Sequence, residues 1–153
     1  MKNVNLSDYE KYRWFFTSKG NLVAGGKSSS QNDELLTNLK QLKKDFIVMH
    51  TSMPGSPFCI ILSDKNKISQ SEIEETAIFT ACFSRQWREQ KKKTQIDIFS
   101  LNQLYKTKNM KTGTWGVKSP VKKMIVNLEL VLTKQNGKLR AVPKTTAKNK
   151  KDI

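Results

Sequence analysis

Residues 76–83 are apolar almost without interruption, and they lie inside a segment that otherwise has the pattern of an α-helix. Ser69 and Glu72 match a capping box at its beginning, and basic residues follow near its end, where the helix dipole favours cations. A helix that is apolar on nearly all sides must be surrounded by other elements of the fold. We therefore expect this helix to lie at the centre of the core, with Trp87 as a packing residue.

Several short strands are predicted on either side of this helix. Residues 12–16 and 22–24 are separated by the turn-forming residues 18–21, which predicts a β-hairpin. Alternation within residues 124–132 places Leu132 on the core side of a further strand and Glu129 on the solvent side. The other predicted strands are 46–50, 58–62, 95–101 and 138–142, the last one after an Asn136-Gly137 turn.

A second helix is predicted directly after the hairpin. Ser30 is expected to cap it, and lysines near its end suit the helix C-terminus. Its apolar face consists of leucines, namely Leu35, Leu36, Leu39 and Leu42. Two helices and a mostly antiparallel β-sheet built from hairpins define the α+β class, and 153 residues suffice for a single domain with its own core.

The domain is expected to span residues 11–143, between an N-terminal extension of residues 1–10 and a basic, disordered tail of residues 144–153. No apolar run approaches the ~18 residues of a membrane-spanning helix. Residues 1–12 also lack the apolar centre of a signal peptide. These features predict a cytoplasmic protein that has no membrane partner.

The net charge of +15 is concentrated towards the C-terminus. Residues 1–97 carry 15 basic and 11 acidic side chains, whereas residues 98–153 carry 13 and 2. An AT-rich genome would raise the lysine content everywhere, but it does not explain the loss of acidic residues after Asp97. We therefore interpret residues 98–128, which include Trp115 and no acidic residue, as a polyanion-binding segment. Its candidate contacts are Lys106, Lys108, Lys111, Lys118, Lys122 and Lys123.

The sequence Gly25-Gly26-Lys27-Ser28 is similar to part of a phosphate loop. A phosphate loop needs Gly, four residues and then Gly-Lys-Ser/Thr, whereas five residues separate Gly20 from Gly26 here and include predicted strand. Nucleotide hydrolysis is therefore not expected. Two interpretations stay open: a plain strand-to-helix turn, or a helix N-terminus that holds one phosphate beside Lys27.

Histidine and cysteine are too few to predict a catalytic or metal centre. His50 is the single histidine and lies at the end of a predicted strand, where a hydrogen-bonding role is favoured over a catalytic one. Cys59 and Cys82 lie inside apolar runs, which is typical of buried free thiols. A structural zinc site would need more ligands, so we expect neither a metal nor another cofactor.

Four segments resemble the NFACT-R family, the RNA-binding domain found in the NFACT proteins of ribosome quality control and also as a stand-alone protein. They are KYRWFFTSKGNLVAGGKSSSQNDELL, VMHTSMPGS, ETAIFTACFSRQW and IDIFSLNQLYKTKNMKTGTWGV, in family order. Lys27 and Lys118 stand where the family usually has Arg, and lysine does not bind a phosphate in the bidentate way. The resemblance implies RNA contacts from Arg13, Trp14, Lys27, Asn32, His50 and Lys106 with the Gly113 segment.

These observations predict a non-enzymatic RNA-binding domain that holds structured RNA, either transfer RNA or ribosomal RNA, chiefly through its phosphates. The resemblance alone implies a link to translation or ribosome quality control. Trp115 either stacks on an unpaired base or packs on the sheet. The alternatives are an RNA-modifying or RNA-processing enzyme that uses His50, and a DNA-binding or protein-interaction module that uses the same basic face.

Overall fold

The computed structural model describes residues 6, 8–53 and 55–148. Its centre is a six-stranded antiparallel sheet with the strand order β1-β2-β4-β3-β5-β8. These strands span Arg13–Phe16 (β1), Leu22–Gly25 (β2), Cys59–Ile61 (β4), Ile47–Thr51 (β3), Lys93–Ser100 (β5) and Lys122–Asn127 (β8). The predicted hairpin is confirmed, because β1 and β2 pair in antiparallel register.

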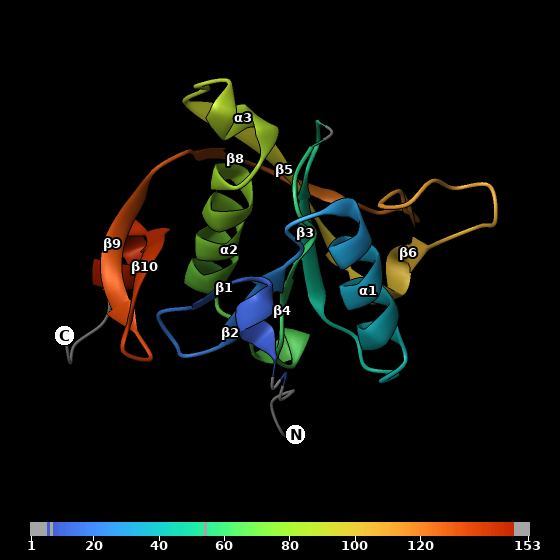
Figure 1. Ribbon diagram of the computed structural model, residues 1–153, viewed down its shortest axis with the longest axis horizontal. Helices are drawn as coiled ribbons and strands as arrows, with labels where there is room; N and C mark the ends of the chain where they lie inside the picture. Colours follow the sequence, from blue (N-terminus) through green and yellow to red (C-terminus); the bar gives the residue numbers. More distant parts are fainter. Residues whose placement is uncertain (1–5, 7, 54, 149–153) are drawn as a thin grey trace.

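The two longer helices, α1 (Ser29–Lys40) and α2 (Gln70–Cys82), cover opposite faces of this sheet (Figure 1). Successive residues of the central strands therefore point into two different cores. Val48 and Ile60 pack on the α1 side, whereas Met49 and Ile61 pack on the α2 side with Phe79. The predicted α+β class is confirmed, and α2 is the buried helix that its sequence indicated.

Shorter elements complete the described part of the chain. They are the 3-10 helices Tyr9–Lys11, Lys65–Lys67 and Leu101–Gln103, the helices α3 (Arg85–Arg88) and α4 (Lys144–Lys148), and the strands β6 (Leu104–Tyr105), β7 (Gly116–Val117), β9 (Leu130–Gln135) and β10 (Lys138–Pro143). β6 pairs with β7, and β9 pairs with β10, in two separate two-stranded sheets. Within the described ranges, no helix combines the length and apolar character that crossing a membrane requires.

The helix predicted around residues 76–83 ends earlier than its pattern indicates. α2 stops at Cys82, and Ser84 caps the separate helix α3 by accepting a hydrogen bond from the Gln86 N–H. After this break Trp87 lies at the surface, where it is 45% exposed. The prediction that Trp87 packs in the core is therefore wrong.

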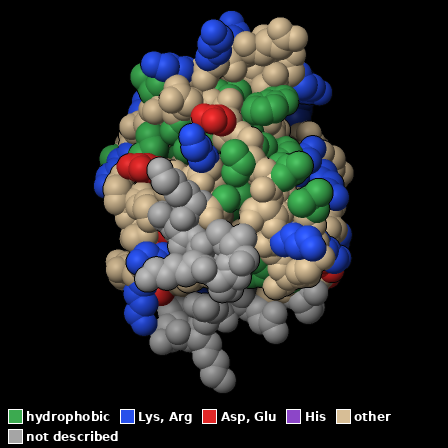
Figure 2. Space-filling view, turned by 90° about the vertical axis from the view of Figure 1, so that its left-hand side faces the viewer, with side chains coloured by type: hydrophobic (Ala, Val, Ile, Leu, Met, Phe, Trp, Pro, Cys, Tyr) green, Lys and Arg blue, Asp and Glu red, His purple; other side chains and the backbone are tan. Residues whose placement is uncertain are grey.

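The C-terminal strands also depart from their pattern. The predicted strand of residues 124–132 breaks after Asn127, so that β8 belongs to the central sheet and β9 to a hairpin with β10. Leu132 is 68% exposed instead of facing the core, and Leu139 of β10 is similarly exposed. Figure 2, which views the side of the molecule where β9 and β10 lie, shows hydrophobic side chains among Lys and Arg.

The hairpin of β9 and β10 covers the outer edge of β1. The Gln135 side chain accepts a hydrogen bond from the Phe16 N–H and donates one to the Phe16 carbonyl, both at 2.7 Å. Arg140 donates to the Trp14 carbonyl at 2.7 Å, and its guanidinium lies 3.9 Å from the centre of the Trp14 ring. The backbone groups at this edge are therefore bonded by side chains instead of by another strand.

α4 stands where the sequence predicted the beginning of a disordered tail. Its Thr146 is buried and donates a hydrogen bond to the Glu75 carboxylate at 2.7 Å. Glu75 also accepts hydrogen bonds from the backbone N–H and the hydroxyl of Ser18, at 2.8 and 2.6 Å. Residues 149–153 of the predicted tail lie outside the described residues.

A second buried carboxylate, Glu72, ties the turn between β1 and β2 to α2. It accepts hydrogen bonds from the Thr17 hydroxyl and the Asn21 amide, each at 2.6 Å, and completes the capping box with Ser69. Burial alone would raise the pKa of Glu72. These hydrogen bonds outweigh burial and hold the pKa below its ordinary value.

We expect Glu72→Gln to lower the free energy of unfolding by about 1–2 kcal/mol at neutral pH, because the amide keeps only one acceptor oxygen for these donors. A lowered pKa means that the carboxylate stabilises the fold above the unfolded-state pKa and that this contribution is lost as the pH falls through the folded-state pKa. Urea unfolding of both proteins between neutral and acidic pH measures the effect. The stability difference should shrink on acidification, and a difference independent of pH would contradict the role of the charge.

Candidate functional site

Two adjoining hollows lie around the N-terminus of α1. The first hollow, of about 630 Å³, is bounded by β1, the turn before α1, the end of α2, α3 and the beginning of β9. The second hollow, of about 390 Å³, is bounded by α1, β3, β5 and the segment that precedes β7. They share the wall residues Ser29, Asn32, Gly55 and Ser56, so together they form one groove across the N-terminus of α1.

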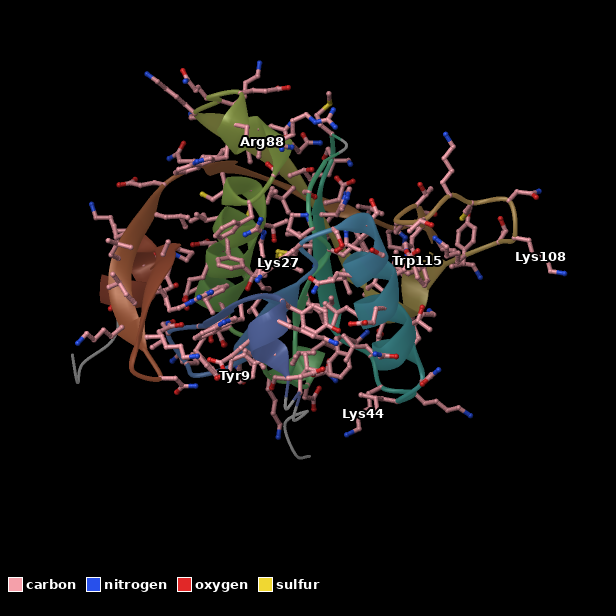
Figure 3. The ribbon with its side chains drawn as sticks, viewed as in Figure 1. Tyr9, Lys27, Lys44, Arg88, Lys108 and Trp115 are labelled. Carbon is pink, nitrogen blue, oxygen red and sulfur yellow. The ribbon has the colours of Figure 1, made fainter. Side chains whose placement is uncertain are left out.

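The first hollow is basic. Arg13, Lys27 and Arg88 line it, and none of its described wall residues is Asp or Glu. The Arg13 guanidinium lies 4.6 Å from the centre of the Phe83 ring, a contact that holds this cation at the wall. Figure 3 labels Arg88 on α3 and Lys27 at the turn before α1. Because cations gather here without a carboxylate among them, the first hollow suits an anionic ligand.

Glycine and asparagine together shape the turn that carries Lys27. A Cβ on Gly26 would lie 2.2 Å from Asn32 Oδ1 and 2.7 Å from the Asn32 backbone nitrogen, so a residue with a side chain does not fit. The Asn32 Oδ1 also accepts a hydrogen bond from the Phe58 N–H at 3.2 Å. Asn32 therefore joins α1 to the strand region behind it while the turn packs closely against the helix.

Helix α1 begins where the two hollows meet. Ser28 caps it by accepting a hydrogen bond from the Gln31 N–H, whereas the sequence pattern predicted Ser30. Ser29, the first residue of the helix, lines both hollows. Within the first turn the N–H groups of Gln31 and Asn32 are bonded to Ser28, which leaves those of Ser29 and Ser30 without an acceptor in the helix or its cap. The Lys27 N–H is bonded to the Gln31 side chain at 2.9 Å, as in a plain strand-to-helix turn, and phosphate binding beside Lys27 stays a prediction.

Two residues that the resemblance implicated in RNA contact are buried. Trp14 is 2% exposed, lies under Arg140 and makes edge-to-face contacts with Tyr9 and Phe16. A direct RNA contact by the Trp14 side chain is therefore wrong. Asn32 is 7% exposed, and its amide oxygen is already bonded to the Phe58 N–H, so it shapes the groove wall.

Asp33 of α1 fastens the segment between β6 and β7 to the groove. Its carboxylate accepts hydrogen bonds from the Trp115 indole N–H at 2.8 Å and from the Gly113 N–H at 3.0 and 3.1 Å. The Lys106 ammonium lies 3.3 Å from the same carboxylate and donates to two carbonyl oxygens of the segment. We call these four residues the Asp33 clamp. Partial burial alone would raise the pKa of Asp33, but the donors outweigh it and lower the pKa.

Trp115 and Lys106 therefore hold the segment in place. Trp115 packs against the core on the α1 side, and the Lys106 Nζ lies 5.2 Å from the centre of its ring. The packing contact that one interpretation of Trp115 expected is present, and because the residue also borders the second hollow, base stacking stays a prediction. Lys106, which was predicted as an RNA contact, is an ion-paired residue of the clamp.

The other lysines predicted to bind RNA lie at the surface. Lys108, Lys111, Lys118 and Lys122 are exposed and have no ion-pair partner among the residues that the structure describes. Lys123 is also exposed, but its ammonium is paired with Asp97 at 2.7 Å. In Figure 3 Lys108 projects from the segment between β6 and β7, far from the helices. The structure thus distinguishes four unpaired lysines from the paired Lys106 and Lys123.

His50 lines the second hollow and has structural contacts. Its ring stacks on Phe58 with 4.3 Å between ring centres, and its Nδ1 lies 2.8 Å from the Thr51 carbonyl oxygen, so Nδ1 carries the hydrogen. Burial lowers the pKa of His50, which leaves the ring neutral at pH 7. The Ser52 hydroxyl nearby donates to Asp97 at 2.5 Å instead of to His50. These residues therefore do not form a nucleophile-base pair.

The two cysteines are the buried free thiols that their surroundings predicted. Burial raises the pKa of Cys59 and of Cys82 to about 12. A thiol with such a pKa stays protonated at neutral pH, and the thiol form is a poor nucleophile. The geometry therefore gives no support to an enzyme that uses His50 with either cysteine.

Trp87 and Arg88 are two wall residues of the first hollow that the sequence analysis does not identify as site residues. Both were assigned to the end of one long helix, which hid their separation from α2. One signal was present: Ser84 is a good N-cap residue in the middle of the predicted helix. If Ser84 is taken as the N-cap of a new helix, α3 is separate from the buried helix. Trp87 then no longer belongs to the buried helix and is not required to face the core.

Comparison with known families gives a match over most of this fold. A family model described as the NFACT protein RNA binding domain matches residues 11–119. These residues include both hollows except for their wall residues in β9 and β10. The hairpin of β9 and β10 and the helix α4 follow the matched region.

Known relatives match a shorter stretch. The archaeal Rqc2 homolog aRqcH of Methanocaldococcus jannaschii is 34% identical over 80 residues, which are 52% of this chain and 12% of that protein. The ribosome quality control complex subunit NEMF of Homo sapiens and that of Mus musculus are each 26% identical over 80 residues, 52% of this chain and 7% of theirs. The match thus covers a small part of each relative.

A solved structure has the same fold. It is the C-terminal part of the fibronectin/fibrinogen-binding protein from Streptococcus suis, with a TM-score of 0.64 and 24% sequence identity. The likeness covers 80% of this chain and 47% of that one. At this identity it supports the architecture alone.

Proposed function

This chain belongs to the NFACT protein RNA binding domain family, and on that premise we propose that it is a non-enzymatic module that holds structured RNA chiefly through the RNA phosphates. One observation carries the proposal. Arg13, Lys27 and Arg88 line the first hollow, whose described wall residues include no carboxylate. Contacts to phosphates supply a large part of the affinity of proteins for nucleic acids, so a group of cations without a carboxylate in the same hollow is the feature that RNA binding needs.

The groove offers places for more than one phosphate. The N-terminus of α1 favours an anion through its dipole and through the N–H groups of Ser29 and Ser30, which have no acceptor within the helix. The acidic residues in the first turns of α1 do not oppose this, because Asp33 is bonded within the clamp and Glu34 is bonded to Tyr12 and Lys11. The unpaired surface lysines extend the positive charge beyond the groove.

Transfer RNA and ribosomal RNA are the partners that we propose. The human and mouse relatives are named as ribosome quality control complex subunits, and the archaeal relative is named as an Rqc2 homolog. If this protein acts at the ribosome, as we propose, it is located in the cytoplasm. Folded RNA also presents phosphates at fixed spacings, which suits a groove whose walls are held by hydrogen bonds.

We expect RNA binding that weakens steeply with salt. If ~5 phosphates are neutralised, the logarithm of the affinity should fall against the logarithm of the salt concentration with a slope of about −3.5 to −4.5. Fluorescence anisotropy of a labelled RNA hairpin at several salt concentrations measures this slope. A slope near zero, or no retention of RNA at low salt, would overturn the proposal.

A charge-matched pair of variants tests where the RNA binds. Neutralising the first hollow with Arg13→Gln, Lys27→Gln and Arg88→Gln should flatten the salt slope by about 2–3. The control removes the same charge elsewhere with Lys43→Gln, Lys44→Gln and Lys67→Gln, which do not line either hollow. Equal losses in both variants would show general attraction without a defined interface. Equal competition by DNA of the same sequence would favour the DNA-binding alternative.

A further inference from the structure

We propose that the first hollow receives one unpaired nucleotide of the bound RNA, with its base against Trp87 and its phosphate beside Lys27 and Arg13. This inference rests on the proposed function and adds a ligand class to it. A module that contacted only the phosphates of a duplex would read all helical RNA alike. A hollow that admits one extruded nucleotide would instead select RNA that has a bulge, a loop or a free end.

The first argument for this proposal is the size of the first hollow. Its volume of about 630 Å³ falls within the roughly 300–1,000 Å³ of pockets that enclose small ligands. Phosphates on the outside of a duplex are contacted from an open surface and require no such space. A base that is paired and stacked inside a duplex cannot enter a side pocket, whereas an unpaired base can.

The second argument is that the walls of the first hollow divide into an apolar side and a polar side. Phe83, Trp87 and Leu130 give the hollow an apolar side, whereas Lys27, Ser28 and Ser29 give it a polar side at the N-terminus of α1. A nucleotide has the same division, because its flat base is stacked on aromatic groups and its phosphate is bound by cations and N–H groups. The walls therefore match both parts of one nucleotide.

The third argument is the exposure and position of Trp87. It is a large aromatic residue, it is 45% exposed, and it lies on the four-residue helix α3 beside Arg88. The Arg13 guanidinium lines the same hollow and lies 4.6 Å from the centre of the Phe83 ring. An exposed tryptophan with two arginines in the same hollow suits a single nucleotide, since an aromatic ring stacks on a base and cations bind a phosphate.

The experiment compares two RNA hairpins with the same stem, one fully paired and one with a single bulged nucleotide, together with a third in which the bulged position is abasic. The wild-type protein should bind the bulged hairpin roughly 5- to 100-fold more tightly than the other two. Trp87→Ala should remove this preference and leave the affinity for the paired stem and the salt slope unchanged. Trp87→Phe should keep most of the preference, because phenylalanine retains an aromatic face.

Two controls separate the failure of this inference from the failure of RNA binding. Thermal unfolding should show that Trp87→Ala folds like the wild type, as expected for an exposed side chain, and Lys118→Gln should lower the affinity for all three hairpins by the same factor. Equal wild-type affinity for the three hairpins would overturn the nucleotide pocket while the proposed function stands. Absence of binding to any hairpin would overturn both.

A second arm distinguishes a nucleotide within RNA from a free nucleotide. Adenosine 5′-monophosphate is titrated into the protein, and the indole N–H signal of Trp87 is followed by NMR, assigned by its loss in Trp87→Phe. Weak, saturable shifts that disappear in Lys27→Gln support the pocket when the bulged hairpin also binds and competes for it. Binding of the mononucleotide without competition by the hairpin would overturn the assignment to RNA.

Discussion

Alanine in place of Gly26 is expected to lower the free energy of unfolding by about 2–3 kcal/mol and to weaken RNA binding at the same time. The added Cβ would lie 2.2 Å from Asn32 Oδ1 and 2.7 Å from the Asn32 backbone nitrogen, so the turn and the start of α1 must move apart. This movement breaks the hydrogen bond between Asn32 and the Phe58 N–H and shifts Lys27 at the first hollow. Urea unfolding and RNA titration measure the two effects.

Gly20→Ala is the matched control. Gly20 has a φ of +84°, which costs a residue with a side chain about 1–2 kcal/mol, but nothing lies within 4 Å of a Cβ at this position. This variant should lose some stability and keep wild-type RNA affinity. If Gly26→Ala also kept full RNA affinity in spite of its lower stability, the turn that carries Lys27 would not belong to the interface.

Asp33→Ala is expected to release the segment between β6 and β7 and to lower the free energy of unfolding by about 2–3 kcal/mol, because hydrogen bonds to a charged acceptor are lost and their donors remain. The donors are the Trp115 indole N–H, the Gly113 N–H and the Lys106 ammonium. Hydrogen exchange of the Gly113 amide and of the Trp115 indole, followed by NMR, should accelerate strongly. Unchanged exchange would mean that other contacts hold the segment.

Asp33→Asn isolates the contribution of the charge. Asparagine keeps one oxygen for the Trp115 indole but removes the ion pair with Lys106. Because the pKa of Asp33 is lowered in the fold, its carboxylate stabilises the protein above the unfolded-state pKa, and this contribution is lost as the pH falls through the folded-state pKa. The wild type and Asp33→Asn should therefore approach equal stability at acidic pH. A constant difference would assign the effect to shape instead of charge.

The fold class could be predicted because its signals are local. A turn of permissive residues at 18–21 specified the hairpin of β1 and β2, and the capping box at Ser69 specified the beginning of α2. The breaks after Cys82 and Asn127 could not be read in the same way. In both places the apolar pattern continues across the break, and only tertiary contacts decide where one element ends.

The candidate site was predicted in part, and its differences from the structure have two causes. Charge patterns indicate which residues are cationic, but they do not show which cations have partners, so the paired Lys106 and Lys123 were grouped with unpaired lysines. The family resemblance pointed to Arg13 and Trp14 together. Because other elements cover β1, alternation along this strand does not show which of its side chains are exposed. Of the two residues, only Arg13 lines the groove.

The contacts of Gln135 and Arg140 with β1 also occupy backbone groups to which a strand of a second copy of this chain could otherwise bind. A sheet edge with free N–H and carbonyl groups is a template on which a strand of a second molecule can add, and such pairing leads to aggregation. Gln135 bonds both edge groups of Phe16, and Arg140 bonds the Trp14 carbonyl. At the opposite edge β8 begins with the exposed Lys122, and a lysine on an edge strand disfavours such pairing. Both edges of the central sheet are thereby protected against intermolecular strand addition.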